Sequence, residues 1–299
     1  MLTIGSRGSK LALWQANHVM GRLAGVGYQC RLEIIKTTGD VRTDVSMKEV
    51  GNKGIFTKEI EEALLDGRID IAVHSMKDMP TALPAGLTIA AIPEREDVRD
   101  VLIGKTLAQL PRGARIGTGS LRRIAQLLAH RPDLKMLPIR GNVDTRIRKL
   151  DEGEFDAIVL AAAGLNRLGW DHRISEHIGV EVMCPAVGQG ALCVETRGDG
   201  GPGAQACARL DNHETRSAVV AERAVLAQLG GGCQVPIGAN GTVDGRKLHL
   251  RAIVIAPDAS RLVRDEMDGS IENAEQLGAR MAERLIAAGA NEILAAASA

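Results

Sequence analysis

The chain has 299 residues, 45% hydrophobic and 25% charged, which is typical of a globular protein with two or three domains. Its 37 basic and 37 acidic residues cancel, so no global field would draw it to nucleic acid or acidic membranes. The longest nearly unbroken apolar stretch, Ala157–Leu165, is far shorter than the roughly 18 residues of a membrane span. The N-terminal residues do not resemble a signal peptide. We therefore expect a cytoplasmic protein that binds neither membranes nor nucleic acid.

In chain order, the first two-thirds of the sequence repeats one theme: a short β-rich run, a Gly/Ser/Arg segment, and then a helix. The expected strands are Thr3–Gly5, Ile69–His74, Arg115–Gly117, Met136–Ile139 and Ala157–Ala161. The expected helices include Leu11–Leu23, one that ends near Ala129, and Val143–Leu150. Apolar runs that alternate with helices predict βαβ units around parallel sheets.

Two stretches are rich in charge or in residues that break regular structure, Glu94–Val98 and Pro185–Gly190. If the chain crosses between domains at both, it leaves one α/β lobe, completes a second and returns, which gives paired hinges and a cleft. The expected domains are therefore residues 1–93 with 191–208, residues 99–184, and residues 213–299.

The third of these domains shows a different pattern. A helix near Glu214–Leu229 is followed by short strands at Lys247–Ile255 and Ser260–Met267 and by a final helix, Ile271–Ala288. This order predicts a smaller α+β domain.

Arginine outnumbers lysine by 27 to 10, and arginine is the side chain that grips carboxylates and phosphates with two parallel hydrogen bonds. A GC-rich genome would also enrich arginine. The positions of the arginines along the chain must therefore distinguish a binding role from an effect of genome composition. The arginines that follow predicted strands, or lie one helical turn beyond, are Arg7, Arg122, Arg123, Arg140, Arg146 and Arg167. Ligands of open α/β sheets bind at the carboxyl ends of strands, so this placement predicts a ligand with several carboxylates or phosphates.

Two hydroxyls and a helix start add to this prediction. Thr118, Gly119 and Ser120 precede a helix, whose free N–H groups and dipole favour an anion. Ser120 could instead be an ordinary N-cap. A phosphate loop of the GxxxxGK type is absent, which weakens the nucleotide option.

The segment HSMKD, His74–Asp78, brings an imidazole, a hydroxyl, an ammonium and a carboxylate to one strand end. Asp78 could form a surface ion pair with Lys77, which would stabilise the fold little. Alternatively, Asp78 stays ionised in the cleft and stabilises positive charge that develops on a substrate. The spacing alone leaves both readings open.

The five cysteines, Cys30, Cys184, Cys193, Cys207 and Cys233, are too scattered for a zinc site or a disulfide framework. No metal is expected. Most of these cysteines are expected to be small buried hydrophobes. Cys233 differs because it lies in GGCQVPIG, where glycines let other atoms approach the sulfur. Its thiolate could be a nucleophile or an attachment point, or the residue could be buried and inert.

Taken together, these segments resemble the porphobilinogen deaminase (hydroxymethylbilane synthase) family over nearly the whole chain. The matching segments, in the order of the family, are SRGSKLALWQA, TTGD, GNKGIFTKE, DIAVHSMKD, GTGSLRR, RGNVDTR, LAAAGLNRLG, PAVGQGA and GGCQVPIG. One departure is Gly119, where the commonest family pattern has TSS before LRR and this chain has TGS.

The resemblance implies a three-domain α/β fold whose first two lobes are similar to those of the periplasmic binding proteins. It also implies a transferase of porphyrin and heme biosynthesis. This transferase condenses four porphobilinogen molecules head to tail, with loss of ammonia, into hydroxymethylbilane. The primer is a dipyrromethane cofactor bound by a thioether to the cysteine that matches Cys233. A monomer is expected from the family alone.

The resemblance also implies roles for individual residues. The catalytic aspartate matches Asp78, whose carboxylate would stabilise the azafulvenium cation that forms as ammonia leaves. The expected cofactor contacts are Ser75, Lys77, Thr118, Ser120, Arg122, Arg123 and Arg146. The expected substrate contacts are Arg7, Ser9, Arg140 and Arg167. Phe56 and Lys53 match a mobile lid over the active site.

Two other functions are compatible with single features of the sequence. A two-lobed protein could capture solutes without catalysis, but the presence of both Asp78 and Cys233 argues against this. An RNA- or DNA-binding protein could use the arginine-rich loops, but two Trp, one Tyr and two Phe leave few stacking platforms for bases.

Overall fold

The computed structural model describes residues 1–38, 57–230 and 235–298. Lys53, Phe56 and Cys233 lie outside the described residues. The chain divides into two compact units, unit 1 with Met1–Glu96 and Ala191–Arg216, and unit 2 with Asp97–Gly190 and Ser217–Ala299. The three domain boundaries expected from the sequence stay a prediction.

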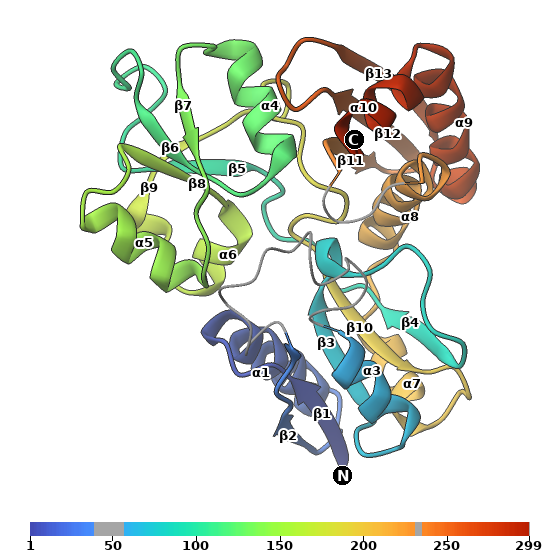
Figure 1. The fold of residues 1–299 in the computed structure, drawn as a ribbon. Coiled ribbons are helices and arrows are strands. Elements are labelled where there is room, and N and C mark those ends of the chain that lie inside the picture. The colour runs from blue at the N-terminus through green and yellow to red at the C-terminus, as the bar shows by residue number, and fades with distance from the viewer. Residues whose placement is uncertain (39–56, 231–234, 299) are drawn as a thin grey trace. The chain divides into compact units, whose positions relative to one another are not determined.

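Unit 1 contains a five-stranded sheet in the order β2-β1-β3-β10-β4 (Figure 1). The strands are β1 (Leu2–Ser6), β2 (Cys30–Ile34), β3 (Ile71–Ser75), β4 (Leu87–Ala91) and β10 (Leu192–Arg197). Strands β1, β2 and β3 run parallel, whereas β10 is antiparallel to both of its neighbours. The sheet is therefore mostly parallel with one reversed strand.

Helices cover both faces of this sheet. They are α1 (Lys10–Gly25), α3 (Lys58–Leu65) and α7 (Pro202–Cys207), with single 3-10 turns at η1 (Met76–Asp78) and η3 (Ala208–Leu210). Val19 and Leu23 of α1 pack with Ile71 and Val73, whereas Ile60 and Leu64 of α3 pack with Ala72. Because successive side chains of a strand point to opposite faces, β3 contributes to both cores and is apolar almost throughout.

Unit 2 contains a second five-stranded sheet, in the order β7-β6-β8-β5-β9. Its strands are β5 (Asp100–Ile103), β6 (Arg115–Gly117), β7 (Lys135–Leu137), β8 (Ala157–Ala161) and β9 (Ile174–His177). Its helices are α4 (Leu121–His130), α5 (Val143–Asp151), α6 (Ala162–Arg167) and the turn η2 (Asp171–Arg173). Strands β6, β7 and β8 are parallel, and β5 is antiparallel to β8.

A third sheet, also in unit 2, is a three-stranded antiparallel meander with its own core. Its strands are β11 (Ile237–Asp244), β12 (Lys247–Ile255) and β13 (Leu262–Ser270). The helices around it are α8 (His213–Gln228), α9 (Ala274–Ala287) and α10 (Ala290–Ser298), with the turn η4 (Ile271–Asn273) before α9. The α/β class with a smaller α+β part at the C-terminal end is confirmed. Among the described helices, none combines the length and apolar character that crossing a membrane requires.

The predicted strands at residues 115–117 and 157–161 agree with β6 and β8 residue for residue. Strand β11 was missed because its sequence, IGANGTVD, contains two glycines and an asparagine. Its glycines are required by neighbours: a Cβ on Gly238 would lie 2.9 Å from the carbonyl oxygen of Cys184, and one on Gly241 would lie 3.1 Å from the Ala218 Cα. Close packing, and not strand propensity, therefore selects these residues.

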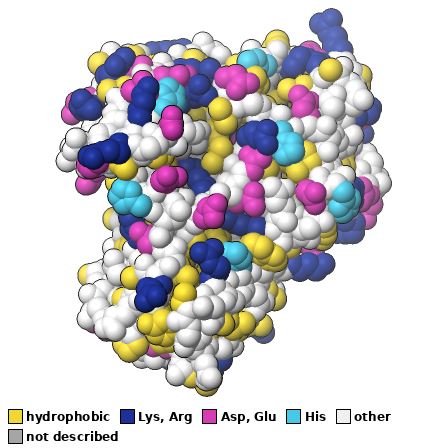
Figure 2. Space-filling model, turned by 180° about the vertical axis from the view of Figure 1, so that it is seen from behind, with side chains coloured by type: hydrophobic (Ala, Val, Ile, Leu, Met, Phe, Trp, Pro, Cys, Tyr) yellow, Lys and Arg dark blue, Asp and Glu magenta, His cyan; other side chains and the backbone are white. Residues whose placement is uncertain are grey.

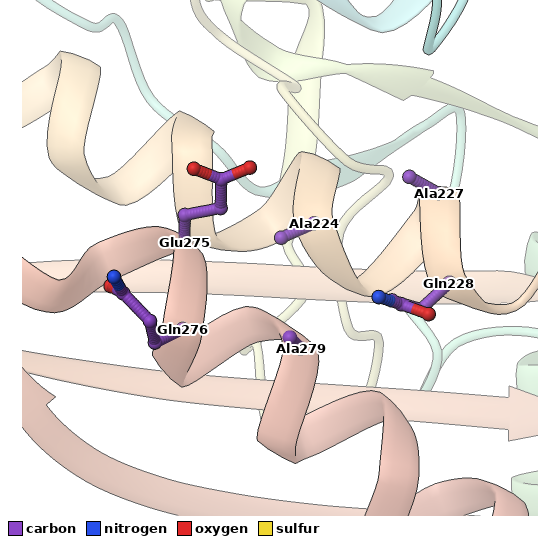
Figure 3. Close-up of a pocket in the computed structure, with 6 residues that line it drawn as sticks. All are labelled: Ala224, Ala227, Gln228, Glu275, Gln276 and Ala279. Carbon is purple, nitrogen blue, oxygen red and sulfur yellow. The ribbon is translucent and has the colours of Figure 1, made fainter.

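Helices α8 and α9 also approach each other through small residues. A Cβ on Gly278 would lie 2.2 Å from the carbonyl oxygen of Ala221, so only glycine fits there. Alanines and polar side chains of the same two helices line a pocket of about 200 Å³ (Figure 3). The two helices thus approach each other closely at Gly278 and also line a pocket.

We expect Gly278→Ala to lower the free energy of unfolding by about 1–3 kcal/mol because the new methyl group overpacks the contact with Ala221. Gly21→Ala is the matched control, because Gly21 lies in α1 with nothing within 4 Å of the added Cβ. This control should raise stability by about 0.5–1 kcal/mol. Urea unfolding followed by circular dichroism measures the free energy of unfolding of both variants. Equal changes in the two variants would contradict the close approach of the helices at Gly278.

Candidate functional site

One edge of the unit 1 sheet carries most of the polar residues predicted in that unit. Strands β1 and β3 are parallel, so Arg7 and Ser9 after β1 share an edge with the residues that follow β3. Ser75 ends β3, and Lys77 and Asp78 lie in the turn η1. The amide of Met76 donates to the carbonyl of Ala191 at 3.0 Å, which fixes this turn against the start of β10.

Gln15 links the two segments on this edge. It lies on the buried face of α1 with Ala12, Ala16 and Val19, and its Nε2 donates to the Ser75 hydroxyl at 2.8 Å. Ser9 caps α1 by accepting from the amide of Ala12 at 3.3 Å. Sequence reasoning missed Gln15, although a polar residue in the apolar stripe of a helix is a signal that could have found it.

Asp78 is exposed and Lys77 is half-buried, so the carboxylate is accessible to a ligand. Behind the turn, His74 lies 3.2 Å from a carboxylate oxygen of Glu195, and both side chains are buried. Burial raises the pKa of the neighbouring Glu61, and the carboxylate of Glu195 adds to this effect. His74 is therefore a buried structural residue that supports the strand, whereas Asp78 faces solvent.

The unit 2 sheet also gathers polar residues at one edge. Its parallel strands β6, β7 and β8 end at the same side, so the segments that begin at Thr118, at Arg140 and at α6 are neighbours. Strand β5 runs the other way, and the pairing of Asp100 with Ala161 brings the beginning of β5 to this edge. The structure thus places an aspartate among the predicted arginine loops.

Asp100 is fully buried and holds two of these arginines. Nη1 of Arg122 donates to one carboxylate oxygen at 2.7 Å, and Nε and Nη2 of Arg123 donate to the other at 3.0 and 2.7 Å. The amide of Gln189 donates to the same carboxylate at 3.0 Å. Burial alone would raise the pKa of Asp100, but the two guanidinium charges outweigh it and hold that pKa well below its ordinary value. Neither this aspartate nor this glutamine was among the site residues predicted from the sequence.

Backbone carbonyls also accept hydrogen bonds from these three side chains. Arg122 donates to Cys184 at 2.6 Å, Arg123 to Val159 at 3.0 Å, and Gln189 to Val98 at 2.8 Å. Arg122 and Arg123 are only 4% and 6% exposed. They are built into the fold of unit 2, and their predicted contact with a cofactor stays a prediction.

Helix α4 begins beside this cluster. No side chain caps its N-terminus at Ser120, and the Thr118 hydroxyl instead accepts from the Ser120 amide at 3.2 Å. Ser120 thus occupies the N-cap position without a capping hydrogen bond from its side chain, and the first N–H groups of the helix have no side-chain cap. Thr118 is fully buried and Ser120 is half-buried at this helix start.

Three more predicted arginines lie on the same sheet edge. Arg140 is exposed, and Nε of Arg146 donates to the carbonyl of Gly141 at 2.8 Å. Gly141 has φ of +107°, and a Cβ there would lie 2.7 Å from the Thr145 side chain, so this turn requires glycine. Arg167 is buried and its Nη2 donates to the carbonyl of Gly190 at 2.6 Å. This edge can bind an anion through guanidiniums, hydroxyls and helix N–H groups.

The described cysteines do not offer a reactive thiolate. Burial raises the pKa of Cys184 and Cys207 to about 12 and also raises that of Cys30, while Cys193 is fully buried. Among the residues that the structure describes, no group of three or more His, Cys, Asp and Glu is suited to hold a metal ion.

The fold and this geometry define an α/β protein in which guanidiniums, hydroxyls and the uncapped start of a helix gather at one edge of a parallel sheet. Residues 2–201 match the family model "Porphobilinogen deaminase, dipyromethane cofactor binding domain", and residues 217–287 match "Porphobilinogen deaminase, C-terminal domain". The chain belongs to the porphobilinogen deaminase family.

Curated relatives agree with this assignment. The chain is 53% identical over 298 residues to a porphobilinogen deaminase of Geobacter metallireducens, with 98% of this chain and 94% of that protein covered. It is 51% identical over 297 residues to that of Pelobacter propionicus, with 98% and 96% covered. Among solved structures, a periplasmic substrate-binding protein of an ABC transporter from Coxiella burnetii is 16% identical. It covers 70% of this chain and 91% of its own, with a TM-score of 0.42.

Gly119 departs from the family pattern, and the structure does not require glycine there. A Cβ on Gly119 would meet only the carbonyl oxygen of Ile139, at 3.4 Å. By contrast, a Cβ on Gly117 would lie 2.9 Å from side-chain atoms of Ile158 and Phe155.

We therefore expect Gly119→Ser to stabilise the protein by about 0.4–1 kcal/mol, because the unfolded chain loses freedom, and to preserve its activity. Gly117→Ala is the contrast, and should destabilise the protein by about 1–3 kcal/mol through overpacking. Thermal unfolding and steady-state kinetics test both variants. A tenfold loss of activity in Gly119→Ser would contradict the conclusion that a side chain is tolerated at this position.

Proposed function

We propose that this protein condenses four porphobilinogen molecules head to tail, with loss of ammonia, into hydroxymethylbilane. The observation that carries the proposal is the match of both family models across residues 2–201 and 217–287. The arrangement of the residues agrees with it. Each porphobilinogen ring carries two carboxylates, and unit 2 gathers guanidiniums, hydroxyls and helix N–H groups at one sheet edge.

The donor set of unit 2 fits a dipyrromethane cofactor. Two guanidiniums and one carboxylate leave a net charge of +1 at the start of α4, which favours an anionic group. When bound, the dipyrromethane supplies a pyrrole ring to which the first substrate ring is joined. We propose that Cys233 carries it through a thioether. The raised pKa of Cys30, Cys184 and Cys207 makes these three poor alternatives.

For unit 1 we propose that Asp78 is the catalytic residue. Loss of ammonia leaves a delocalised cation on the substrate, and an ionised carboxylate near the pyrrole N–H stabilises that charge as it forms. The exposure of Asp78 at the end of β3 supports this role, because a ligand can reach it. The contacts from Met76 and Gln15 hold the segment in place.

The remaining predicted residues keep the roles that the family resemblance implies, as proposals. The cofactor contacts are Ser75, Lys77, Thr118, Ser120, Arg122, Arg123 and Arg146. The substrate contacts are Arg7, Ser9, Arg140 and Arg167. The lid role that the resemblance implies for Phe56 and Lys53 is likewise a proposal, and both lie outside the described residues.

We also propose that the protein is a cytoplasmic monomer with three domains that does not bind nucleic acid. Acidic and basic side chains are interspersed on the face drawn in Figure 2, and the net charge is zero, so this face offers no continuous basic track for a phosphate backbone. A filter-binding titration against salt would show a steep slope if nucleic acid were the ligand.

The intact mass of the purified protein tests the tether. We expect an adduct of dipyrromethane size on the wild type and none on Cys233→Ser, because no other sulfur would carry it. Cys30→Ser is the matched control, since Cys30 is only half-buried, and should keep the adduct. An unmodified wild-type mass would show that the protein has no covalent cofactor.

Kinetics of Asp78 variants test the catalytic carboxylate. Asp78→Asn should lower kcat by roughly 10²–10³-fold or more, because the charge that stabilises the cation is lost. Asp78→Glu should retain part of the activity because it keeps the charge. The control is Asp66→Asn, an exposed aspartate that caps α3 in the same unit, which should stay near the wild-type rate. Full activity of Asp78→Asn would remove Asp78 from the mechanism.

A further inference from the structure

Asp100 is not among the proposed cofactor or substrate contacts, yet it is hydrogen-bonded to two of the proposed cofactor contacts. Its two carboxylate oxygens divide the two arginines between them, one oxygen for Arg122 and the other for Arg123. Each guanidinium is held a second time by a backbone carbonyl, that of Cys184 for Arg122 and that of Val159 for Arg123. Two acceptors at fixed positions determine the plane of each guanidinium. Neither side chain therefore loses conformational entropy when a ligand binds.

Sheet topology explains why the aspartate can reach both arginines. Arg122 and Arg123 are the second and third residues of α4, which follows β6, and β8 pairs with both β6 and β5. Since β5 is antiparallel, its first residue lies at the edge where α4 begins. Two cations in the first turn of a helix oppose the helix dipole, and the Asp100 carboxylate compensates for them.

The charges in this cluster do not cancel. Two guanidiniums face one carboxylate, which leaves a net +1, and among the described residues no second carboxylate contacts Arg122 or Arg123. A buried charge without a counter-charge is unfavourable. A carboxylate from outside the chain would complete the pairing, next to helix N–H groups that no side chain caps.

We propose that Asp100 is a positioning residue, which presets the guanidiniums of Arg122 and Arg123 to receive a carboxylate of the pyrrole chain. This inference rests on the proposed function. Gln189 has a supporting part, because its amide binds both Asp100 and the carbonyl of Val98 and so holds the carboxylate in place. Asp100 touches neither substrate nor cofactor and acts only through the two arginines.

Three variants of the full chain, purified as they are expressed, test this role. Asp100→Asn removes the charge, and Asp100→Glu keeps the charge but moves the carboxylate by one methylene. The matched control is Asp156→Asn. Asp156 also pairs with an arginine, Arg115 at 3.3 Å, but at the opposite ends of strands β6 and β8. For each variant we would measure the fraction loaded with cofactor by intact mass, the melting temperature, and KM and kcat per loaded chain.

We expect Asp100→Asn to reduce the loaded fraction and to raise the KM for porphobilinogen by roughly tenfold or more, with a smaller effect on kcat, because the arginines lose their orientation. Asp100→Glu should fall between this variant and the wild type. Asp156→Asn should keep the loading and KM of the wild type. A purely structural role would lower the melting temperature of Asp100→Asn and leave KM per loaded chain unchanged.

The inference would be overturned if the loaded fraction and the KM of Asp100→Asn both stayed within twofold of the wild-type values. If Asp100→Asn does not fold, Asp100→Glu decides: an unchanged KM rejects the role, and a raised KM at an unchanged melting temperature supports it. The wild type separates this result from the proposed function. A wild type that carries no adduct and does not consume porphobilinogen refutes the proposed function itself, whereas an active wild type with insensitive Asp100 variants refutes only the positioning role.

Discussion

The buried carboxylate of Asp100 is the interaction on which the arrangement of unit 2 depends. A buried ion cluster is stable only when its members are well aligned and hydrogen-bonded, and removing one partner costs about 3–5 kcal/mol. Here a single carboxylate accepts from Arg122, Arg123 and Gln189, and these donors also bind the backbone at Cys184, Val159 and Val98. The cluster therefore joins the start of α4, the centre of the sheet and the segment before β10. Its position at the predicted anion site connects the stability of this unit with its chemistry.

Both five-stranded sheets use the same construction. The parallel strands end at one edge of the sheet, where the loops that follow them lie. One antiparallel strand begins at the same edge. In unit 2 this antiparallel strand, β5, begins with Asp100, which holds the arginines. In unit 1 the residue just before this strand, Ala191, accepts a hydrogen bond from the amide of Met76 and so fixes the turn of Asp78. In each case the polar residues at the edge are oriented by a partner that is distant in sequence.

Much of the fold could be predicted because it rests on local patterns. Short apolar runs followed by glycine, serine and arginine located β6 and β8 residue for residue and placed the arginines beyond strand ends. Strand β11 could not be found in this way, because Gly238 and Gly241 are selected by close neighbours and not by strand propensity. Helix α10 was also missed, since the last helix expected from the sequence ended at Ala288, and α10 begins only after the turn at Gly289, whose φ is +99°.

The sequence by itself determined the α/β class, the family and the candidate residues, because residue types and their spacing along the chain carry that information. It also indicated Asp78 and Cys233, the second of which lies outside the described residues. Only the tertiary structure decided that Arg122 and Arg123 are buried and held by one aspartate, that Gln15 holds Ser75, and that the Ser120 side chain makes no capping hydrogen bond to its helix. Such contacts join residues that are far apart along the chain: 60 positions separate Gln15 from Ser75, and 91 separate Gln189 from Val98. Their geometry depends on strand order and direction, which spacing along a single chain does not specify.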